Sequence, residues 1–166
     1  MGSNRFQVQV HENQILRIRE MCNANNMPLI EEYDFRKDNR TPDLKIELKS
    51  TTIVRDYQER SLSKMFSNGR ARSGIIVLPC GAGKTLTGIA AASHIKKSVM
   101  VLCNSNVSVE QWRQQFYQWA KMDGSPVVAF TSKENSKIFD QSKGEAGVVV
   151  STYFMIAYQG TRNPEI

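Results

Sequence analysis

The sequence lacks several features that would point to a membrane, secreted or metal-binding protein. Its 166 residues contain no run of about 18 apolar residues, so we expect no membrane span. Residues 1–10 have no apolar stretch of the kind that a secretory signal requires, and no internal repeat or low-complexity tract is present. The only cysteines are Cys22, Cys80 and Cys103. Their odd number and irregular spacing favour a reducing compartment and predict no metal site.

The composition is that of one domain, or of one domain with a short extension. A hydrophobic content of 40% is enough for a core, and a net charge of +6 permits a polyanionic partner without requiring one. The basic residues are spread along the chain. A solvated helix face explains much of their densest group, which is Arg55, Arg60, Lys64, Arg70 and Arg72.

The strongest motif is a glycine-rich stretch at residues 73–85. The four apolar residues 75–78 (IIVL) predict a short buried strand, and a helix pattern begins directly after residues 79–85 (PCGAGKT). A strand, a glycine loop, a Lys-Thr pair and a helix in this order are typical of the phosphate-binding P-loop. Leu78 departs from the strict pattern, which has glycine there. The alternative is an ordinary glycine turn followed by a chance Lys-Thr pair.

Each residue type in this loop suits phosphate binding. Gly81 and Gly83 allow the backbone N–H groups to turn inward and phosphate to approach closely. The start of the following helix adds free N–H groups and a partial positive charge. Lys84 supplies a charge for the β- and γ-phosphates, and the Thr85 hydroxyl is suited to hold Mg²⁺.

Strands and helices alternate through this part of the chain, which predicts an α/β fold with a mostly parallel sheet. One predicted helix places four large apolar residues on one face, which would be either a base-stacking platform or, as we expect, core: Val109, Trp112, Phe116 and Trp119. The predicted strands cover 98–103, 126–130 and 147–151, and the predicted helices cover 54–67, 84–97 and 108–121.

The joint order of four segments resembles a known family. Arg55-Asp56-Tyr57-Gln58 precedes LPCGAGKT by about twenty residues, and NSNVSVEQW and VVVSTY follow. This order resembles the first RecA-like lobe of superfamily 2 helicases, and within them the XPB-type translocases of the transcription and repair factor TFIIH. The likeness runs from about residue 20 to residue 157. A P-loop alone indicates only an NTPase, whereas the joint pattern is far more specific.

The resemblance implies a RecA-like P-loop NTPase lobe whose sheet is flanked by helices and is incomplete at its C-terminal end. Residues 1–50 would be a lead-in segment of strand, helix, loop and strand, and residues 51–166 the first part of helicase lobe 1. The implied function is ATP-driven translocation on DNA in transcription initiation and nucleotide excision repair, in the nucleus. The implied partners are DNA, other TFIIH-type subunits and a second helicase lobe.

The resemblance also implies site residues. Gln58 would pair with the adenine edge, because an amide both donates and accepts hydrogen bonds. Ser105 and Thr152 would contact the nucleic-acid backbone. Read alone, Gln58 would be a helix-surface residue and Thr152 a β-branched strand end. Lys84 and Thr85 would act on ATP and Mg²⁺ as catalytic residues, Thr85 as the metal ligand. The full nucleotide-binding set would be Arg55, Gln58, Pro79, Cys80, Gly81, Ala82, Gly83, Lys84 and Thr85.

Two features expected of a complete motor do not occur in the sequence. No Asp-Glu pair is present, and Asp140 is a poor substitute because its flanks are polar. No second lobe with an arginine finger follows. We therefore expect a truncated first lobe that binds nucleotide weakly, with strand 75–78 short of sheet neighbours. The rivals are a P-loop kinase or GTPase, for which no Asn-Lys-x-Asp motif is found, and a noncatalytic scaffold that docks partner proteins.

Overall fold

The computed structural model describes residues 8–27, 29–134 and 139–157. The chain divides into two compact units, Met1–Glu32 and Tyr33–Ile166. The first unit contains a 3-10 turn, Glu12–Gln14, and helix α1, Ile15–Ala24, none of whose residues is fully buried. The second unit contains the P-loop and the sheet.

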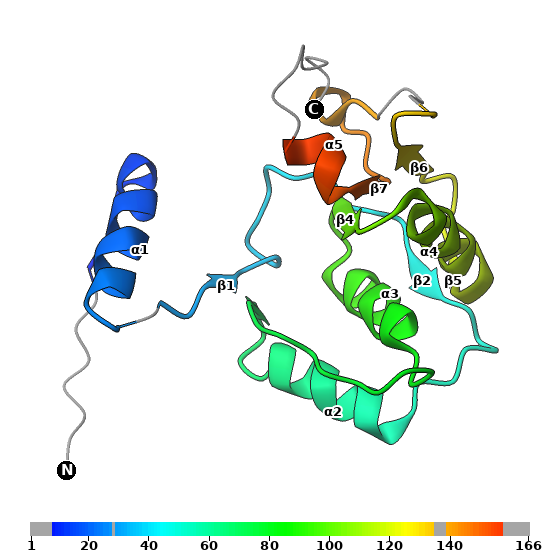
Figure 1. The fold of residues 1–166 in the computed structure, drawn as a ribbon, viewed down its shortest axis with the longest axis horizontal. Coiled ribbons are helices and arrows are strands. Elements are labelled where there is room, and N and C mark those ends of the chain that lie inside the picture. The colour runs from blue at the N-terminus through cyan, green and yellow to red at the C-terminus, as the bar shows by residue number, and fades with distance from the viewer. Residues whose placement is uncertain (1–7, 28, 135–138, 158–166) are drawn as a thin grey trace. The chain divides into compact units, whose positions relative to one another are not determined.

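The centre of the second unit is a three-stranded parallel sheet in the order β4-β7-β6 (Figure 1). Its strands are β4 (Val99–Cys103), β6 (Val127–Phe130) and β7 (Val148–Thr152). In the register, Val150 of β7 lies opposite Val101 on one side and Ala129 on the other. All five residues of β7 are buried, as expected for the middle strand of a parallel sheet. The predicted α/β fold with a parallel sheet is confirmed.

Helices α3 (Lys84–Ile95) and α4 (Asn106–Trp119) pack on each other, and α4 contacts all three strands. The apolar face of α4 is core, as expected. Val109 and Phe116 are each 1% exposed, and Trp112 and Trp119 pack against the same cluster. The base-stacking alternative for this face is therefore wrong.

The lead-in residues 33–50 lie in the same compact unit as the P-loop. Leu44 and Ile46 are fully buried within the core cluster. The strand expected at the start of the lead-in segment is not found at residues 8–10, and residues 1–7 lie outside the described residues. The division into functional segments at residue 50 stays a prediction. The remaining elements are β1 (Glu32–Tyr33), β2 (Glu47–Leu48), α2 (Asp56–Met65), β3 (Ala71–Arg72), β5 (Ala120–Lys121), a 3-10 turn (Gln141–Lys143) and α5 (Tyr153–Ala157).

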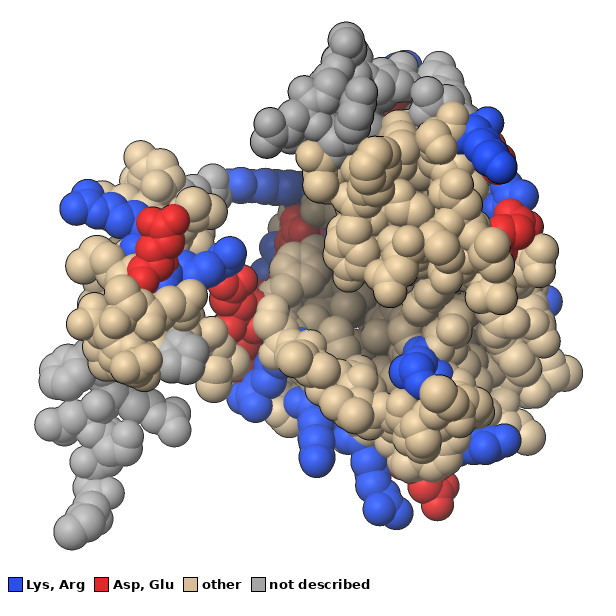
Figure 2. Space-filling model, viewed as in Figure 1, with Lys and Arg blue, Asp and Glu red and all other residues tan. Residues whose placement is uncertain are grey.

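The basic residues of α2 and its flanks form an exposed charged surface. Figure 2 shows Lys and Arg side chains along the lower edge of the second unit, where Figure 1, drawn in the same view, places α2. The predicted solvated helix face is thereby confirmed, since these side chains are all exposed: Arg55, Arg60, Lys64, Arg70 and Arg72.

The predicted strand at residues 75–78 is wrong. This segment has no strand geometry, and Ile75 and Val77 are 91% and 85% exposed. A strand forms only beside another strand, and none of the described strands pairs with this segment. The backbone groups of residues 75–77 make no hydrogen bond to any described residue. The expectation that this segment lacks sheet neighbours is confirmed.

Candidate nucleotide-binding site

The P-loop adopts a conformation that depends on its two glycines. Gly81 has φ 76° and Gly83 has φ 75°, both in the left-handed region that side chains disfavour. Gly83 is also the residue directly before α3. A Cβ atom at Gly83 would lie 2.5 Å from Nε2 of Gln58, which is closer than two such atoms can approach. The backbone therefore favours glycine at this position, and a side chain there would displace the Gln58 amide from its hydrogen bonds.

Lys84 and Thr85 form the first turn of α3, as the P-loop pattern predicts. The N–H groups of a first helical turn have no partner within the helix, so they are available to an anion. The Lys84 ammonium donates to the carbonyl oxygens of Leu78 and Pro79, each at 3.0 Å. It thus lies across the loop, where its charge faces the same space as the helix start.

These residues border an open cleft of about 700 Å³. The residues that line the cleft include Arg55 and Gln58 at the start of α2, together with Gly81, Lys84 and Thr85 of the loop. A second cleft of about 370 Å³ touches Pro79 and Cys80. The donor set fits a polyphosphate, because it offers an ammonium group, a hydroxyl and free N–H groups. No carboxylate is found among the described residues that line the larger cleft, which are Thr51, Ile53, Arg55, Tyr57, Gln58, Gly81–Leu86, Gln115 and Trp119.

Gln58 occupies a different position from the one expected for a base reader. It is 1% exposed, and its side chain bonds within the protein. Its Oε1 accepts from the backbone N–H of Arg55 at 2.9 Å, which satisfies one free donor at the start of α2. Its Nε2 donates to the carbonyl oxygens of Ala82 and Gly83 at 3.0 and 3.1 Å. The base-reading role of Gln58 stays a prediction.

Tyr57 is a member of this site that the sequence reasoning did not single out. Its hydroxyl donates to the Ala82 carbonyl at 3.0 Å, and Nη1 of Arg55 donates to the hydroxyl at 3.3 Å. A tyrosine beside the predicted base-reading glutamine was the only signal that could have indicated it. The structure therefore brings Arg55, Tyr57 and Gln58 together on one side of the loop.

The two residues predicted to contact nucleic acid also lie close together. Thr152 ends β7 directly opposite Cys103 at the end of β4, and Ser105 follows two residues later. Both border a cleft of about 220 Å³ at the carboxyl ends of the strands, where ligands of open parallel sheets bind. Each hydroxyl caps a helix: the Ser105 oxygen accepts from Ser108 N–H, and the Thr152 oxygen accepts from Met155 N–H, both at 3.3 Å. None of the described residues that line this cleft is charged.

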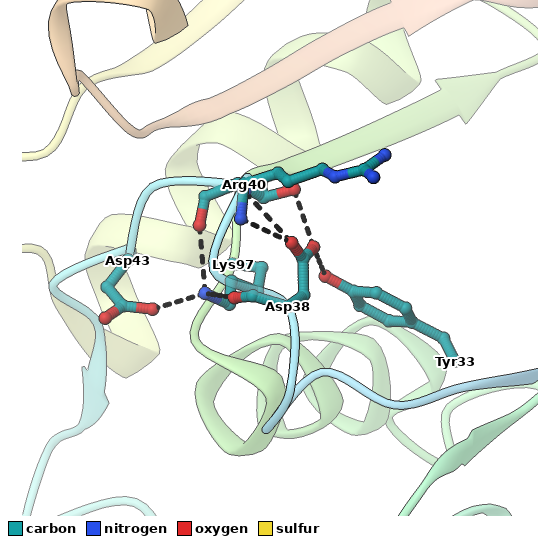
Figure 3. Close-up of polar contacts among 6 residues, drawn as sticks. Tyr33, Asp38, Arg40, Asp43 and Lys97 are labelled. Atoms are coloured by element: carbon teal, nitrogen blue, oxygen red, sulfur yellow. Dashed lines mark hydrogen bonds and ion pairs between the residues drawn. The ribbon is translucent and has the colours of Figure 1, made fainter.

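A polar network outside these three clefts holds residues 33–43, which we call the lead-in loop (Figure 3). The Lys97 ammonium donates to the carbonyl oxygens of Asp38 and Thr41 and pairs with Asp43 at 2.7 Å. Hydrogen bonds from Tyr33 and Thr41 hold the pKa of the Asp38 carboxyl well below its usual range. Burial, and then the Asp38 carboxylate, raise the pKa of Tyr33 to about 12. This network fastens residues 33–43 to the end of α3 and stands apart from the nucleotide cleft.

The described residues offer no ready-made metal centre and no membrane helix. Among them, no group of three or more His, Cys, Asp or Glu side chains is placed to hold a metal ion. Likewise, no described helix is both long and apolar enough to cross a bilayer.

Comparison with known proteins places these features in a family context. The family described as type III restriction enzyme, res subunit, matches residues 51–164. The chain is 57% identical over 155 residues to the "General transcription and DNA repair factor IIH helicase/translocase subunit XPB" of Schizosaccharomyces pombe, covering 93% of this chain and 18% of the relative. It is 60% identical over 146 residues to the XPB/SSL2 subunit of that factor in Saccharomyces cerevisiae, covering 88% and 17%. The chain thus spans about a fifth of these relatives, and the resemblance predicted from its motifs is confirmed.

A solved structure supports the fold independently. The UvsW helicase of bacteriophage T4 matches with a TM-score of 0.50 at 16% identity, over 86% of this chain and 54% of that chain. At this identity the likeness concerns the fold alone. It agrees with the predicted RecA-like lobe.

Proposed function

The chain belongs to the family described as type III restriction enzyme, res subunit, and on that premise we propose that it is the ATP-binding part of a DNA helicase or translocase. The parent activity would be ATP-driven movement on DNA in transcription initiation and nucleotide excision repair. In support, its relatives are named as helicase/translocase subunits of a general transcription and DNA repair factor. The single observation that carries the proposal is the loop in which left-handed Gly83 leads into Lys84 and Thr85 at the start of α3.

ATP and Mg²⁺ are the proposed cofactors. Lys84 would exchange its two carbonyl contacts for the β- and γ-phosphate oxygens, which carry full charge and attract the ammonium more strongly. Thr85 would offer its hydroxyl to Mg²⁺. The N–H groups of Gly81, Gly83, Lys84 and Thr85 would surround the phosphates. The α2 side of the cleft, with Arg55 and Gln58, is where we propose the adenine ring to lie.

DNA is the proposed macromolecular partner, with the backbone meeting the chain at the cleft beside Ser105 and Thr152. The strand ends bring these hydroxyls together, and the start of α4 adds N–H groups that suit a phosphate. We expect weak, sequence-independent binding that falls as salt rises, because such contacts are made to phosphates. By analogy with its relatives, we propose other TFIIH-type subunits and a second helicase lobe as further partners, and a nuclear location.

The test is the affinity for a fluorescent ADP analogue in the wild type, Lys84→Ala and Lys64→Ala. Losing a charged hydrogen bond costs about 1.5–3 kcal/mol, so Lys84→Ala should bind about ten- to a hundredfold more weakly. Lys64 is an exposed lysine of α2 outside the cleft lining, so Lys64→Ala should bind like the wild type. Equal affinity in all three proteins would refute the site. Absence of binding by the wild type would favour the partner-docking scaffold.

A further inference from the structure

We propose that Tyr57 is a positioning residue which, together with Gln58, holds the phosphate loop in its binding conformation before nucleotide arrives. This inference rests on the proposed function and deepens it, because it assigns a role to a residue outside the P-loop motif. The observation behind it is that three side-chain hydrogen bonds from the start of α2 reach the two carbonyl groups that directly precede Lys84.

The contacts form a compact brace, by which we mean the side chains of Tyr57 and Gln58 on the carbonyls of Ala82 and Gly83. The Ala82 oxygen accepts from both side chains, at 3.0 Å each. The Gly83 oxygen accepts from Gln58 and from the backbone N–H of Thr87 at 3.0 Å. Gln58 is fully buried and Tyr57 is half-buried, so water competes little for these bonds.

The direction of these carbonyls fixes the direction of the phosphate-binding N–H groups. In a trans peptide the C=O of one residue and the N–H of the next point in opposite directions, and the chain contains no cis peptide among its described residues. Because the Ala82 carbonyl points toward α2, the Gly83 N–H points away from α2. The same holds for the Gly83 carbonyl and the Lys84 N–H. The brace therefore aims both N–H groups at the open side of the loop, where phosphate would bind.

Among the described residues, only the brace reaches the Ala82 carbonyl, whereas the Gly83 carbonyl also accepts from the backbone N–H and the hydroxyl of Thr87, at 3.0 and 3.2 Å. Within the described residues, the backbone of the loop itself contributes one turn bond, from Ala82 N–H to the Pro79 carbonyl at 3.3 Å. Glycine permits many conformations, so an unbraced Gly81–Gly83 segment would sample several of them and bind phosphate more weakly. Preorganisation by the brace lowers that cost. The Gln58 amide packs so closely on Gly83 that a Cβ atom there would lie 2.5 Å from its Nε2.

This role differs from base reading in what it predicts for ligands. Both N–H donors of the Gln58 amide and its Oε1 acceptor are engaged inside the protein. A base reader discriminates ADP from GDP, whereas a brace affects every ligand that carries the same phosphates. Weakening the brace should therefore lower the affinity for ADP, GDP and inorganic tripolyphosphate by the same factor.

The experiment compares Tyr57→Phe with the matched control Tyr117→Phe. Tyr57→Phe removes one hydroxyl and keeps the ring, and Tyr117 is an exposed tyrosine of α4 whose hydroxyl bonds to no described residue. We expect Tyr57→Phe to weaken ADP, GDP and tripolyphosphate binding about three- to tenfold each, the value of one hydrogen bond. Tyr117→Phe should leave all three affinities unchanged.

A second readout detects the brace without any ligand. The backbone amide resonances of Gly83 and Lys84 in the free protein should shift in Tyr57→Phe and stay in place in Tyr117→Phe. Unchanged resonances, or a loss confined to ADP, would overturn the positioning role. If the wild type binds ADP and Tyr57→Phe binds it equally well, the positioning role alone fails. If the wild type binds neither ADP nor tripolyphosphate, the proposed nucleotide site fails and the positioning role with it.

Discussion

At the scale of single residues, Gly83 is the position where the phosphate loop is least tolerant of a side chain. We predict that Gly83→Ala destabilises the protein by about 1–2 kcal/mol from its left-handed backbone. Displacing the Gln58 amide adds about 1–3 kcal/mol, because its buried hydrogen bonds would break. The measurement is urea unfolding of wild type and variant at equal protein concentration.

The control for this prediction is Gly124→Ala. Gly124 also has a left-handed backbone, with φ 85°, but a Cβ there would meet nothing within 4 Å. It should show the backbone cost alone, so the difference between the two variants isolates the Gln58 contact. Equal destabilisation by both variants would mean that the close approach at Gly83 has no energetic weight.

Single residues of the site differ in how far the sequence reveals them. The position of Lys84 and Thr85 at the start of α3 was predictable because it depends on neighbours within one turn, and the pattern records those neighbours directly. Tyr57 and Gln58 were not predictable as a brace, because their partner Ala82 lies 25 and 24 residues away. A pattern of residue types shows which groups can donate and leaves open which acceptor the fold brings to them.

At the scale of elements, Lys97 fastens the lead-in loop to the end of α3. We predict that Lys97→Met, which keeps most of the aliphatic stem, lowers the free energy of unfolding by about 1.5–3 kcal/mol. The reason is that the Asp38 and Thr41 carbonyls lose a charged donor whose side chain is only 9% exposed (Figure 3). Urea unfolding gives the value.

The neighbouring Lys96 provides a control with the same chemistry. Its ammonium pairs with Glu47 at 3.1 Å, but both side chains are at least half exposed. Exposed ion pairs contribute about 0–1 kcal/mol, so Lys96→Met should have little effect. If Lys97→Met and Lys96→Met had the same free energy of unfolding, the buried contacts of Lys97 would not hold the lead-in loop in solution.

The elements that the sequence predicted well are those with local signals. The apolar runs of β4, β6 and β7 and the periodic face of α4 appear at nearly the expected positions. Helix α4 begins two residues earlier than predicted because Ser105 caps it. Segment 75–78 has the composition of a buried strand, yet strand formation needs a neighbouring strand, and that depends on the sheet as a whole.

At the scale of the whole molecule, residues 75–77 of segment 75–78 present β-branched side chains to solvent, and their backbone groups bond to no described residue. Such segments pair readily with other chains. We predict concentration-dependent self-association of the wild type, measured by sedimentation velocity, and its loss in Ile75→Lys/Val77→Lys. Both side chains are almost fully exposed, so the changes should not disturb packing.

Val107→Lys tests whether any added charge would have the same effect. Val107 is 69% exposed on α4, away from the segment. This variant should associate like the wild type. A wild type that stays monomeric at all concentrations, or a Val107→Lys variant that becomes monomeric as well, would show that the segment does not drive association.

The groups that line the nucleotide cleft are suited to binding ATP but not to hydrolysing it. We therefore predict that the 166-residue chain binds ATP and hydrolyses it very slowly, even with DNA present. The groups at the cleft would bind phosphate in the substrate and in the transition state alike, which gives affinity without rate. Among the described residues no carboxylate lines the cleft to orient an attacking water, and the sequence contains no Asp-Glu pair. The assay is phosphate release by the purified chain, with Lys84→Ala to reveal contaminating ATPases. DNA-stimulated turnover near 1 s⁻¹, roughly the low end for ordinary enzymes, that disappears in Lys84→Ala would contradict the prediction and require a catalytic carboxylate from elsewhere in the chain.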